Sequence, residues 1–520
     1  MNPPKIRDTE VLIVGAGPTG LVLALWLARL GVSVRIVDKT AEPGTTARAV
    51  GVQARTLELY SQIGLADEVV ARGRKAPAAN LWVTGKRAAR FSFGDMGADI
   101  SPFPYALVFP QDEHERFLIE QLAKLGVKVE RQTETLSFEE TNGRVFAQLK
   151  RPDGISETCE AAYIAGCDGA HSTVRESLKI GFAGGTYAHR CYVADVQASG
   201  AAMNGEMHVA VDTTDFLVVF PLKSEGRARL IGTVCDDAEH RQENLAWNDV
   251  SKRVIEGMHL NIERVNWFST YRVHHRVADH FRKGRTFLLG DSAHIHSPVG
   301  GQGLNAGIGD AVNLAWKLAA VLRGQADASL LDSYEPERIA FARRLVATTD
   351  RIFAGVTSGK FSDRMVRLRI VPFLLPLLFK FAPVRHAMFR TISQAAVNYR
   401  GSSLSAGRAF AVHGGDRLPW VKVRSNQASD NYTPLTSLDW QVHIYGDAKN
   451  EIKTVCAERK LPLHIFPWSE QMCRAGLRRN AVYLLRPDGY IAMVDSEAHA
   501  TSVVNYFAAR GFTLPTQRNF

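Results

Sequence analysis

The stretch Gly290-Asp-Ser-Ala-His-Ile-His-Ser-Pro-Val-Gly300-Gly-Gln-Gly-Leu-Asn305 follows a strand-like run, Thr286 to Leu289, and leads into an apolar helix that reaches Ala319. Its glycines let bare backbone approach a flat or bulky group, because a Cβ at these positions would collide with that group. The N-terminus of the helix carries partial positive charge and suits a ligand that develops negative charge. A reduced flavin ring has both properties, so the stretch predicts a flavin-binding loop.

A second glycine motif, Gly15-Ala-Gly17-Pro-Thr-Gly20, lies between a buried strand and an apolar helix. The next strand ends in Asp38, eighteen residues after Gly20. In such a strand–helix–strand unit the first glycine allows a tight turn, and the second lets a pyrophosphate approach the backbone. The third packs the helix on the sheet, and the acid holds a ribose hydroxyl. The spacing predicts a dinucleotide site and leaves FAD and NAD both open.

Three further positions are candidates for the same site. Arg48 follows the second strand and has two equally weighted interpretations, a phosphate ligand or an ordinary surface arginine. Gln111 lies between a strand-like run and a segment whose apolar period predicts a helix. The run Gly166-Cys-Asp168-Gly169 is again a strand, a polar turn and a helix start, with Ser172 as the expected N-cap.

Composition limits the class of protein. The 520 residues are enough for two or three domains, and a 46% hydrophobic, 22% charged composition is that of a globular protein. The formal net charge is +10, but the basic residues are scattered along the chain and no nucleic-acid-binding motif is present. We therefore interpret the positive charge as a means of attracting anionic cofactors. Six irregularly spaced cysteines predict neither a disulfide framework nor a zinc site, and fit a reducing cytoplasm.

Two pairs of histidines and two apolar segments are candidates for metal-binding or membrane-binding sites. His274, His275, His294 and His296 have no suitably spaced carboxylate partners, so no metal is predicted. The apolar run from Val11 to Leu30 is broken by glycines, and no stable membrane insertion is expected. The basic, apolar segment 364–390 leaves three alternatives open: an anionic membrane surface, its own domain, or a second subunit, with the latter two the more usual.

Residues 187–271 contain several short strand-like runs and predict an antiparallel sheet. The order of strands and helices beyond Gly401 is that of a small α/β domain of thioredoxin type. It contains no Cys-x-x-Cys pair, since Cys456 and Cys473 stand alone. Packing or dimerisation is therefore expected of this region rather than thiol chemistry.

The three glycine motifs, in this order, resemble those of the single-component (class A) FAD-dependent aromatic monooxygenases. The likeness is greatest to the branch that contains phenol hydroxylases, 3-(3-hydroxyphenyl)propionate hydroxylases, pentachlorophenol monooxygenases and polyketide hydroxylases, whose members carry a C-terminal thioredoxin-like domain. It covers nearly the whole chain, including Leu484-Leu-Arg-Pro-Asp-Gly489 near the end.

The resemblance implies an α/β fold with a Rossmann-type FAD-binding domain, an inserted antiparallel-sheet substrate domain and a C-terminal thioredoxin-like domain. The FAD-binding domain would comprise residues 1–76, 102–186 and 272–345. The substrate-binding and helical region would comprise residues 77–101, 187–271 and 346–400. The thioredoxin-like domain, without Cys-x-x-Cys, would comprise residues 401–520.

The resemblance also implies the cofactor contacts. Asp38 and Arg48 would bind the ADP half of FAD, Gln111 and Asp291 the ribityl-pyrophosphate region, and the loop 298–305 the ring, while Asp168 is implicated in both FAD and NADPH binding. The full implied set is Gly15, Gly17, Pro18, Thr19, Gly20, Asp38, Lys39, Arg48, Gln111, Asp168, Asp291, Pro298, Gly300, Gly301, Gln302, Gly303, Leu304 and Asn305. Because only one GxGxxG motif is present, NAD(P)H is expected to bind transiently in a surface groove.

The implied activity is hydroxylation of a phenolic or polycyclic aromatic substrate with NAD(P)H and O2, through a flavin C4a-hydroperoxide. Baeyer–Villiger oxygenation, antibiotic inactivation and a non-catalytic flavin redox sensor are the alternatives, and a homodimer is one expected assembly. Some relatives carry a substrate-deprotonating aspartate where this chain has Val50. The catalytic base is therefore left unassigned. By residue type alone the candidates are Tyr105, His208, Asp212 and Tyr271.

Overall fold

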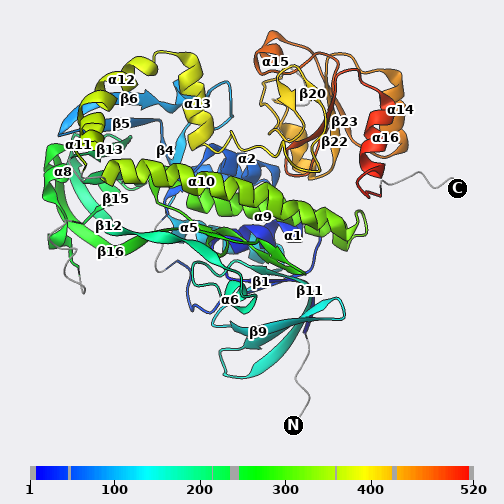
Figure 1. Ribbon diagram of the computed structural model, residues 1–520, viewed down its shortest axis with the longest axis horizontal. Coiled ribbons are helices and arrows are strands. Elements are labelled where there is room, and N and C mark those ends of the chain that lie inside the picture. The colour runs from blue at the N-terminus through cyan, green and yellow to red at the C-terminus, as the bar shows by residue number, and fades with distance from the viewer. Residues whose placement is uncertain are drawn as a thin grey trace.

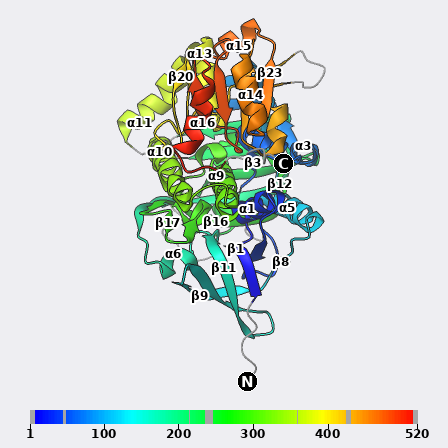
Figure 2. The ribbon, with the colours of Figure 1, turned by 90° about the vertical axis from the view of Figure 1, so that its right-hand side faces the viewer.

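The computed structural model describes residues 7–44, 49–212, 215–234, 245–357, 360–423 and 430–513, with only the backbone described at positions 188 and 299. These residues form a mixed α/β structure in which the glycine motifs and the C-terminal unit lie on opposite sides of two long helices (Figures 1 and 2).

The N-terminal strand β1 (Arg7–Val14) is an inner strand of an eight-stranded sheet. It pairs in parallel with β2 (Val34–Val37) on one side and with β11 (Ser156–Gly166) on the other. The remaining strands of this sheet are β8 (Val129–Glu130), β9 (Glu134–Thr141), β10 (Arg144–Lys150), β17 (Arg282–Lys283) and β18 (Thr286–Leu288). The main order is β17-β18-β11-β1-β2-β8, and an antiparallel β9–β10 hairpin extends β11. The carboxyl ends of β1, β11 and β18 therefore lie side by side, and each of the three glycine motifs follows one of them.

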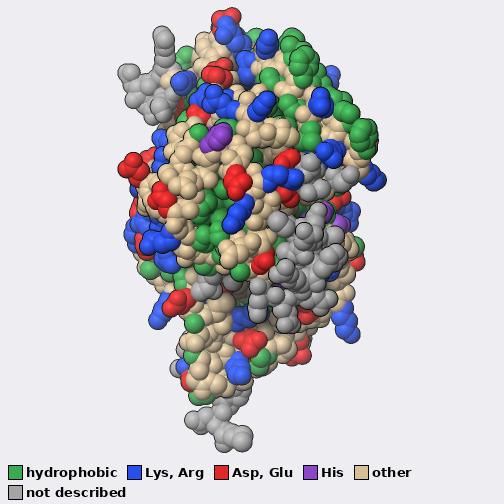
Figure 3. All heavy atoms as spheres, turned by 90° about the vertical axis from the view of Figure 1, so that its left-hand side faces the viewer, with side chains coloured by type: hydrophobic (Ala, Val, Ile, Leu, Met, Phe, Trp, Pro, Cys, Tyr) green, Lys and Arg blue, Asp and Glu red, His purple; other side chains and the backbone are tan. Residues whose placement is uncertain are grey.

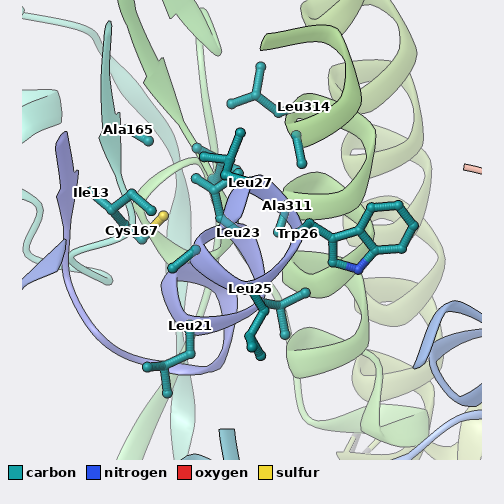
Figure 4. Packing of buried hydrophobic residues seen from close by; sticks show 14 of the residues in the cluster. Ile13, Leu21, Leu23, Leu25, Trp26, Leu27, Ala165, Cys167, Ala311 and Leu314 are labelled. Atoms are coloured by element: carbon teal, nitrogen blue, oxygen red, sulfur yellow. The ribbon is translucent and has the colours of Figure 1, made fainter. Parts of the chain in front are cut away.

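Three helices pack together against this sheet: α1 (Pro18–Arg29), α5 (Gln111–Lys124) and α9 (Gly303–Leu322). Every residue of α1 from Gly20 to Leu27 is buried, because one side of the helix faces the sheet and the other faces α9. Leucines and Trp26 of α1 lie next to Ala311 and Leu314 of α9 (Figure 4). This packing brings the beginnings of α1 and α9, which follow two of the glycine motifs, close together.

A second eight-stranded sheet contains the expected 187–271 region. Its strands are β5 (Ala78–Val83), β6 (Lys86–Ser92), β12 (Phe182–Gly200), β13 (Met207–Val211), β14 (Phe216–Pro221), β15 (Arg227–Thr233), β16 (Leu260–Ala278) and β19 (His294–Ile295). Their order is β19-β16-β12-β15-β14-β13-β5-β6, and all neighbours are antiparallel except β13 and β5. The expected boundaries at 186–187 and 271–272 fall inside β12 and β16, which are continuous strands of 19 residues each. A boundary there would cut both strands, so the sheet joins the two regions without a linker.

Shorter elements lie beside the sheets. A three-stranded sheet contains β3 (Gly51–Val52), β4 (Arg74–Ala76) and β7 (Ala106–Val108). The helices here are α2 (Ala54–Gln62), α3 (Ala66–Arg72), α4 (Phe93–Gly97), α6 (Thr173–Ser177) and α8 (Lys252–Gly257). Beyond α9 the chain forms α10 (Tyr334–Thr357), α11 (Phe361–Met365), the π-helical turn η5 (Val366–Ile370), α12 (Val371–Leu378) and α13 (Ala382–Ile392). Short 3-10 helices are η1 (Trp247–Asp249), η2 (Gly290–Ser292), η3 (Val299–Gly301), η4 (Ala328–Ser333) and η6 (Thr433–Ser437).

The C-terminal unit contains a four-stranded sheet of its own. In chain order it consists of β20 (Arg408–Ala409), β21 (Val412–His413), β22 (Gln441–Tyr445), α14 (Asn450–Glu458), β23 (Leu463–Phe466), α15 (Glu470–Arg474), β24 (Val482–Leu485), β25 (Ile491–Asp495) and α16 (Ala500–Ala508). The order of the four-stranded sheet is β23-β22-β24-β25, with β22 and β23 parallel and the other pairs antiparallel. No helix of the described ranges is long and apolar enough to cross a membrane.

A buried ionic cluster joins the C-terminal unit to the rest of the chain. Glu337 of α10 accepts hydrogen bonds from Lys317 Nζ (2.9 Å), Arg486 Nη1 (2.7 Å), Asn313 Nδ2 (2.6 Å) and Ser402 Oγ (2.7 Å). The side chains of Glu337, Lys317 and Arg486 are almost completely buried. Burial lowers the pKa of Lys317 to about 8 although Glu337 stabilises its charged form. The cluster leaves each buried charge with a partner, as buried charges require.

The buried His114 of α5 makes folding sensitive to acid. Its Nε2 lies 2.8 Å from the hydroxyl of Tyr60, and burial lowers the pKa of His114 to about 3, against an unfolded value near 6.5. The unfolded chain therefore binds this proton first, so the stabilisation is complete above pH 6.5 and is lost as the pH falls towards 3. Replacing His114 with Gln should remove about 1.4 kcal/mol per pH unit from this acid dependence. Thermal melts across this range would measure the slope, with the exposed His259→Asn as control; equal slopes for the two variants would contradict the assignment.

Candidate functional site

The three glycines of the first motif have different roles. Gly15 has φ +103°, and a Cβ there would lie 2.3 Å from the carbonyl oxygen of Cys167, while a Cβ on Gly20 would lie 2.0 Å from the Gly15 oxygen. Both glycines are therefore required by the fold. A Cβ on Gly17 would have no atom of the described chain within 4 Å, and Gly17 lines a cavity. The space in front of Gly17 fits a group that approaches the backbone closely.

Asp38 holds this glycine turn in place. Its Oδ2 accepts the amide of Ala16 (2.7 Å), and its Oδ1 accepts the amide (2.8 Å) and hydroxyl (2.6 Å) of Thr40. Lys39 is exposed beside it, and Arg48 lies outside the described residues. A ribose hydroxyl at Asp38 stays a prediction, and the carboxylate oxygens keep further acceptor capacity for it.

Asp168 lies in the turn between β11 and the short helix α6. It accepts hydrogen bonds from Ser172 Oγ (2.5 Å) and the amide of Val174 (3.1 Å), and burial raises its pKa despite these bonds. Ser172 Oγ in turn accepts the amide of Arg175 (3.0 Å), so the predicted N-cap is confirmed. The neighbouring Gly169 lines the cavity, and a Cβ there would meet no described atom within 4 Å. The site therefore contains Gly169 backbone, with the Asp168 side chain directed to the helix start.

Thr19 brings the first and third motifs into contact. A Cβ on Gly290 would lie 2.7 Å from Thr19 Oγ1, and a Cβ on Gly307 would lie 2.2 Å from the same atom. Only glycine at these two positions leaves room for the Thr19 side chain between them. The turn before α1 and the loop before α9 consequently form one continuous surface.

The loop that ends in α9 has consecutive glycines in left-handed conformations, Gly300 with φ +76° and Gly301 with φ +60°. The Gly301 amide donates to the Pro298 oxygen (3.1 Å), so this donor is used inside the turn. The first amides of α9, at Gly303 and Leu304, have no acceptor within the helix, and both residues line the cavity. These amides are the donors best placed for an anion.

Amide side chains fix the loop. Gln53 Nε2 donates to the Gly300 oxygen (3.0 Å), and Asn305 Nδ2 donates to the Gly301 oxygen (2.9 Å). Gln302 donates from Nε2 to the Ile392 oxygen (2.9 Å) and accepts at Oε1 from Gln394 Nε2 (2.7 Å). The predicted residues Gln302 and Asn305 thus direct their side chains to the protein. Sequence reasoning missed the bracing roles of Gln53 and Gln394, because no spacing distinguishes a bracing amide from a surface one.

Asp310 of α9 also supports this loop, through the backbone of Gly290, and the sequence did not predict this role. It is fully buried, accepts the Gly290 amide (2.9 Å) and Arg338 Nε (2.5 Å), and lies 2.8 Å from His294 Nε2. Burial would raise the pKa of Asp310, but the charges of Arg338 and His294 outweigh it, and the pKa is lowered. His294 therefore belongs to a structural ion cluster beneath Gly290.

The three motifs open on one cavity of about 750 Å³, a volume typical of ligand sites. The predicted residues on its wall are Gly17, Pro18, Thr19, Gln111, Asp291, Pro298, Gly300, Gly301, Gln302, Gly303 and Leu304. The predicted residues that the wall does not include, within the described chain, are Gly15, Gly20, Asp38, Lys39, Asp168 and Asn305.

Beyond the loop the cavity becomes an apolar chamber between the second sheet and the helices α4, α12 and α13. Its wall includes Phe91, Phe93, Met96, Met207, Val209, Val218, Phe220, Ile231, Phe379, Met388 and Ile392. Val50 also lines the chamber.

Polar groups on the chamber wall are few. Tyr271 lines the cavity, whereas the other base candidates within the described residues lie elsewhere: Tyr105, His208, which pairs with Trp82 Nε1 (3.0 Å), and Asp212, which pairs with Arg253 (2.9 Å). His296 also lines the wall. Its Nδ1 donates to the Ser297 oxygen (2.7 Å), so Nε2 is an acceptor, and it has no hydrogen-bond partner among the described residues. Burial lowers the pKa of His296 to about 4, which keeps the ring neutral.

Comparison with known proteins places this geometry in a family. A family model described as an FAD binding domain matches residues 8–349. The 6-methylpretetramide 4-monooxygenase of Streptomyces rimosus is 33% identical, over 96% of this chain and 93% of the relative. The rifampicin monooxygenase of Rhodococcus hoagii is 32% identical, over 96% of this chain and 98% of the relative. The structure of an anhydrotetracycline hydroxylase from Streptomyces rimosus superposes with a TM-score of 0.78 at 27% identity, over 98% of this chain and 100% of that one.

Proposed function

The chain belongs to the FAD-dependent aromatic monooxygenases, and we propose that it hydroxylates a phenolic or polycyclic aromatic substrate with NAD(P)H and O2. The observation that carries the proposal is one cavity that joins the glycine turn and the α9 loop to an apolar chamber with several phenylalanines in its wall. Within the proposal, the chamber favours substrates with several fused rings. The names of two similar proteins, a 6-methylpretetramide monooxygenase and an anhydrotetracycline hydroxylase, indicate substrates of the tetracycline type.

The residues present fit FAD. The open backbone at Gly17 and Gly169 would hold the pyrophosphate, Asp291 and Gln111 would lie along the ribityl chain, and the loop 298–304 would hold the ring. When bound, FAD supplies hydride acceptance and oxygen activation. The chain contributes the amides of Gly303 and Leu304, preorganised to stabilise negative charge, and excludes water with apolar walls.

Substrate orientation falls to the few polar groups of the chamber. The Tyr271 hydroxyl is suited to a hydrogen bond with a substrate hydroxyl, and the neutral His296 offers an acceptor at Nε2 near Gly303. With Val50 replacing a carboxylate, a substrate already acidic enough to ionise, such as a fused-ring phenol, fits this chamber best.

Two finer assignments belong to the same proposal. NAD(P)H would bind transiently, because the sequence contains one GxGxxG motif, which the FAD pyrophosphate would occupy. The C-terminal unit would be a thioredoxin-like domain: its β22-α14-β23 unit, β24–β25 hairpin and α16 follow that order. Of its cysteines, Cys456 is buried and Cys473 exposed, so we assign it a bracing role rather than disulfide exchange.

The test is oxidation of NADPH and NADH by the FAD-loaded protein in air, with a panel of simple phenols and fused-ring phenols, and with product masses measured in parallel. We expect fused-ring phenols to stimulate oxidation and to yield products heavier by one oxygen. Oxidation that no aromatic compound stimulates, with only hydrogen peroxide formed, would contradict the proposal.

A second candidate, antibiotic modification, is favoured by the similarity to a rifampicin monooxygenase. Rifampicin therefore belongs in the panel. Consumption of rifampicin, with loss of its antibacterial activity and no turnover of fused-ring phenols, would favour this second function. Product connectivity by NMR would separate ring hydroxylation from oxygen insertion of the Baeyer–Villiger type.

A further inference from the structure

We infer that the α11–α13 segment is a peripheral docking surface for anionic lipid membranes. Its large apolar side chains lie in solvent, where an ordinary surface would carry polar ones: Phe361 is 77% exposed, Phe373 79% and Phe381 56%. The other exposed apolar residues of this surface are Met365, Val366, Ile370, Leu374, Leu377 and Leu378. Figure 3 shows hydrophobic side chains gathered with Lys and Arg along one edge of the molecule. Contiguous apolar patches of this kind mark interaction sites.

These residues form one stripe because the helical period repeats them. From Phe361 to Phe381 they recur every three to four positions through α11, η5 and α12, the spacing of one helix face. The opposite face is fixed to the protein. Arg367 is buried there and donates to the backbone oxygens of Asp212 (3.1 Å) and Gly355 (2.7 Å). The apolar stripe is therefore held outward and cannot turn into the core.

The charges around the stripe are almost all positive. Residues 360–392 contain seven Lys and Arg and a single acidic residue, Asp363. Arg364, Arg369, Lys380 and Arg390 are exposed. Apolar side chains flanked by basic ones are the composition that binds anionic lipid headgroups and inserts into the interface.

Charge complementarity favours lipid over the other occupants. A second copy of the chain, docked through the same stripe about a two-fold axis, would bring the two basic sets together, which costs free energy. The described part of the chain leaves the stripe exposed, and Arg367 together with the packing of Phe379 against Phe91, with ring centroids 4.3 Å apart, fixes its inner face so that it cannot turn into the domain. An anionic membrane satisfies the apolar and the basic residues together.

The position of this surface has a consequence for substrate entry. Phe379, Met388 and Ile392 on the inner side of the same segment line the apolar chamber. A membrane-bound orientation would therefore place the chamber one helix layer from the lipid, where apolar aromatic compounds concentrate. This inference does not depend on which reaction the chamber supports.

The test is flotation of the full-length FAD-loaded protein with vesicles of equal parts phosphatidylglycerol and phosphatidylcholine, and with pure phosphatidylcholine. We expect flotation with the anionic vesicles and little with the neutral ones, weakened by added salt. The triple variant R364Q/R369Q/K380Q should bind about 100-fold more weakly, at roughly fivefold for each basic residue near the surface. F361S/F373S should also lose most binding, because its two most exposed anchors are gone.

Matched controls separate the surface from general effects. Phe410 is 68% exposed outside this segment, and F410S should float like the unchanged protein, as should K128Q/K179Q/K453Q, three exposed lysines elsewhere. All variants should retain FAD and melt as the unchanged protein does. No flotation with anionic vesicles, or flotation that the stripe variants leave unchanged, would overturn the inference. A concentration-dependent dimer that F361S/F373S abolishes, without flotation, would assign the stripe to a second copy and also overturn it.

Discussion

Replacement of Gly17 by valine is expected to give a folded protein that is purified without the yellow colour of bound flavin. The backbone at Gly17 is extended, with φ −76° and ψ 179°, so valine fits the conformation, and no described atom lies within 4 Å of its Cβ. The new side chain would instead fill the space where the pyrophosphate approaches. We expect FAD affinity to fall at least about 100-fold, equivalent to about 2.8 kcal/mol. FAD titration with thermal melting would measure affinity and folding separately.

The neighbouring Gly20→Ala variant is the matched comparison. A Cβ at Gly20 would lie 2.0 Å from the Gly15 carbonyl oxygen, a backbone atom that cannot move without opening the turn. This variant should lose stability as well as flavin. If the valine variant at Gly17 retains FAD through gel filtration, the pyrophosphate does not approach the chain at this point.

Replacement of Glu337 by glutamine should produce the largest loss of stability. The carboxylate is the shared partner of two buried cations, Lys317 and Arg486, and its pKa is lowered because their charges outweigh the effect of burial. Without the Glu337 carboxylate, the positive charges of Lys317 and Arg486 stay buried and are only partly neutralised by the remaining neighbours. Removing one partner of a buried pair costs about 3–5 kcal/mol, and the loss should fall in this range or above it. Denaturant unfolding followed by tryptophan fluorescence would measure it, since Trp316 lies beside Arg486.

An exposed ion pair gives the control. Glu470 and Arg474 are 3.0 Å apart with side chains 80% and 75% exposed, so E470Q should change stability by less than about 0.5 kcal/mol. If E337Q unfolds at the same denaturant concentration as E470Q, then Lys317 and Arg486 are not charged partners of Glu337.

Backbone requirements explain why the part of the cavity that the glycine motifs form could be predicted from the sequence. Gly15, Gly20 and Gly300 each satisfy a local demand, either a positive φ or a contact that excludes a Cβ, and such demands are visible in short motifs. The strand before each motif places it at the same edge of the sheet. The confirmed N-cap at Ser172 is local in the same sense.

The substrate half depends on contacts between distant segments. Phe379 and Met388 reach the chamber from a segment for which the sequence left three alternatives open, its own domain, a second subunit or, less usually, a membrane surface. In the structure one face of this segment packs against the protein and the other face is exposed to solvent. Its mixed apolar and basic composition reflects these two different surroundings. Val50 and Tyr271 meet there from strands and loops far apart in sequence, and no local pattern encodes that meeting.

The expected domain boundaries show a different limit. Strands in globular proteins are usually five or six residues long, so a change of character near 187 and 271 suggests a change of domain. β12 and β16 are instead strands of 19 residues each that pair along their length, through the glycines at positions 184 and 185 and across three register shifts. Gly184, with φ +144°, lets the two strands approach so closely that a Cβ would lie 1.8 Å from the His275 oxygen.

The bracing of the α9 loop sets an order of events during protein synthesis. Gln53 leaves the ribosome long before Gly300, but Gln394 follows later, and Arg486, which pairs with Glu337, comes close to the end of the chain. At about 5–20 residues per second, the interval between Gly301 and Arg486 lasts roughly ten to forty seconds. For most of that interval the nascent chain carries Lys317 and Glu337 without Arg486. The bracing of the α9 loop and the buried ionic cluster are therefore completed only once Gln394 and Arg486 have been synthesised.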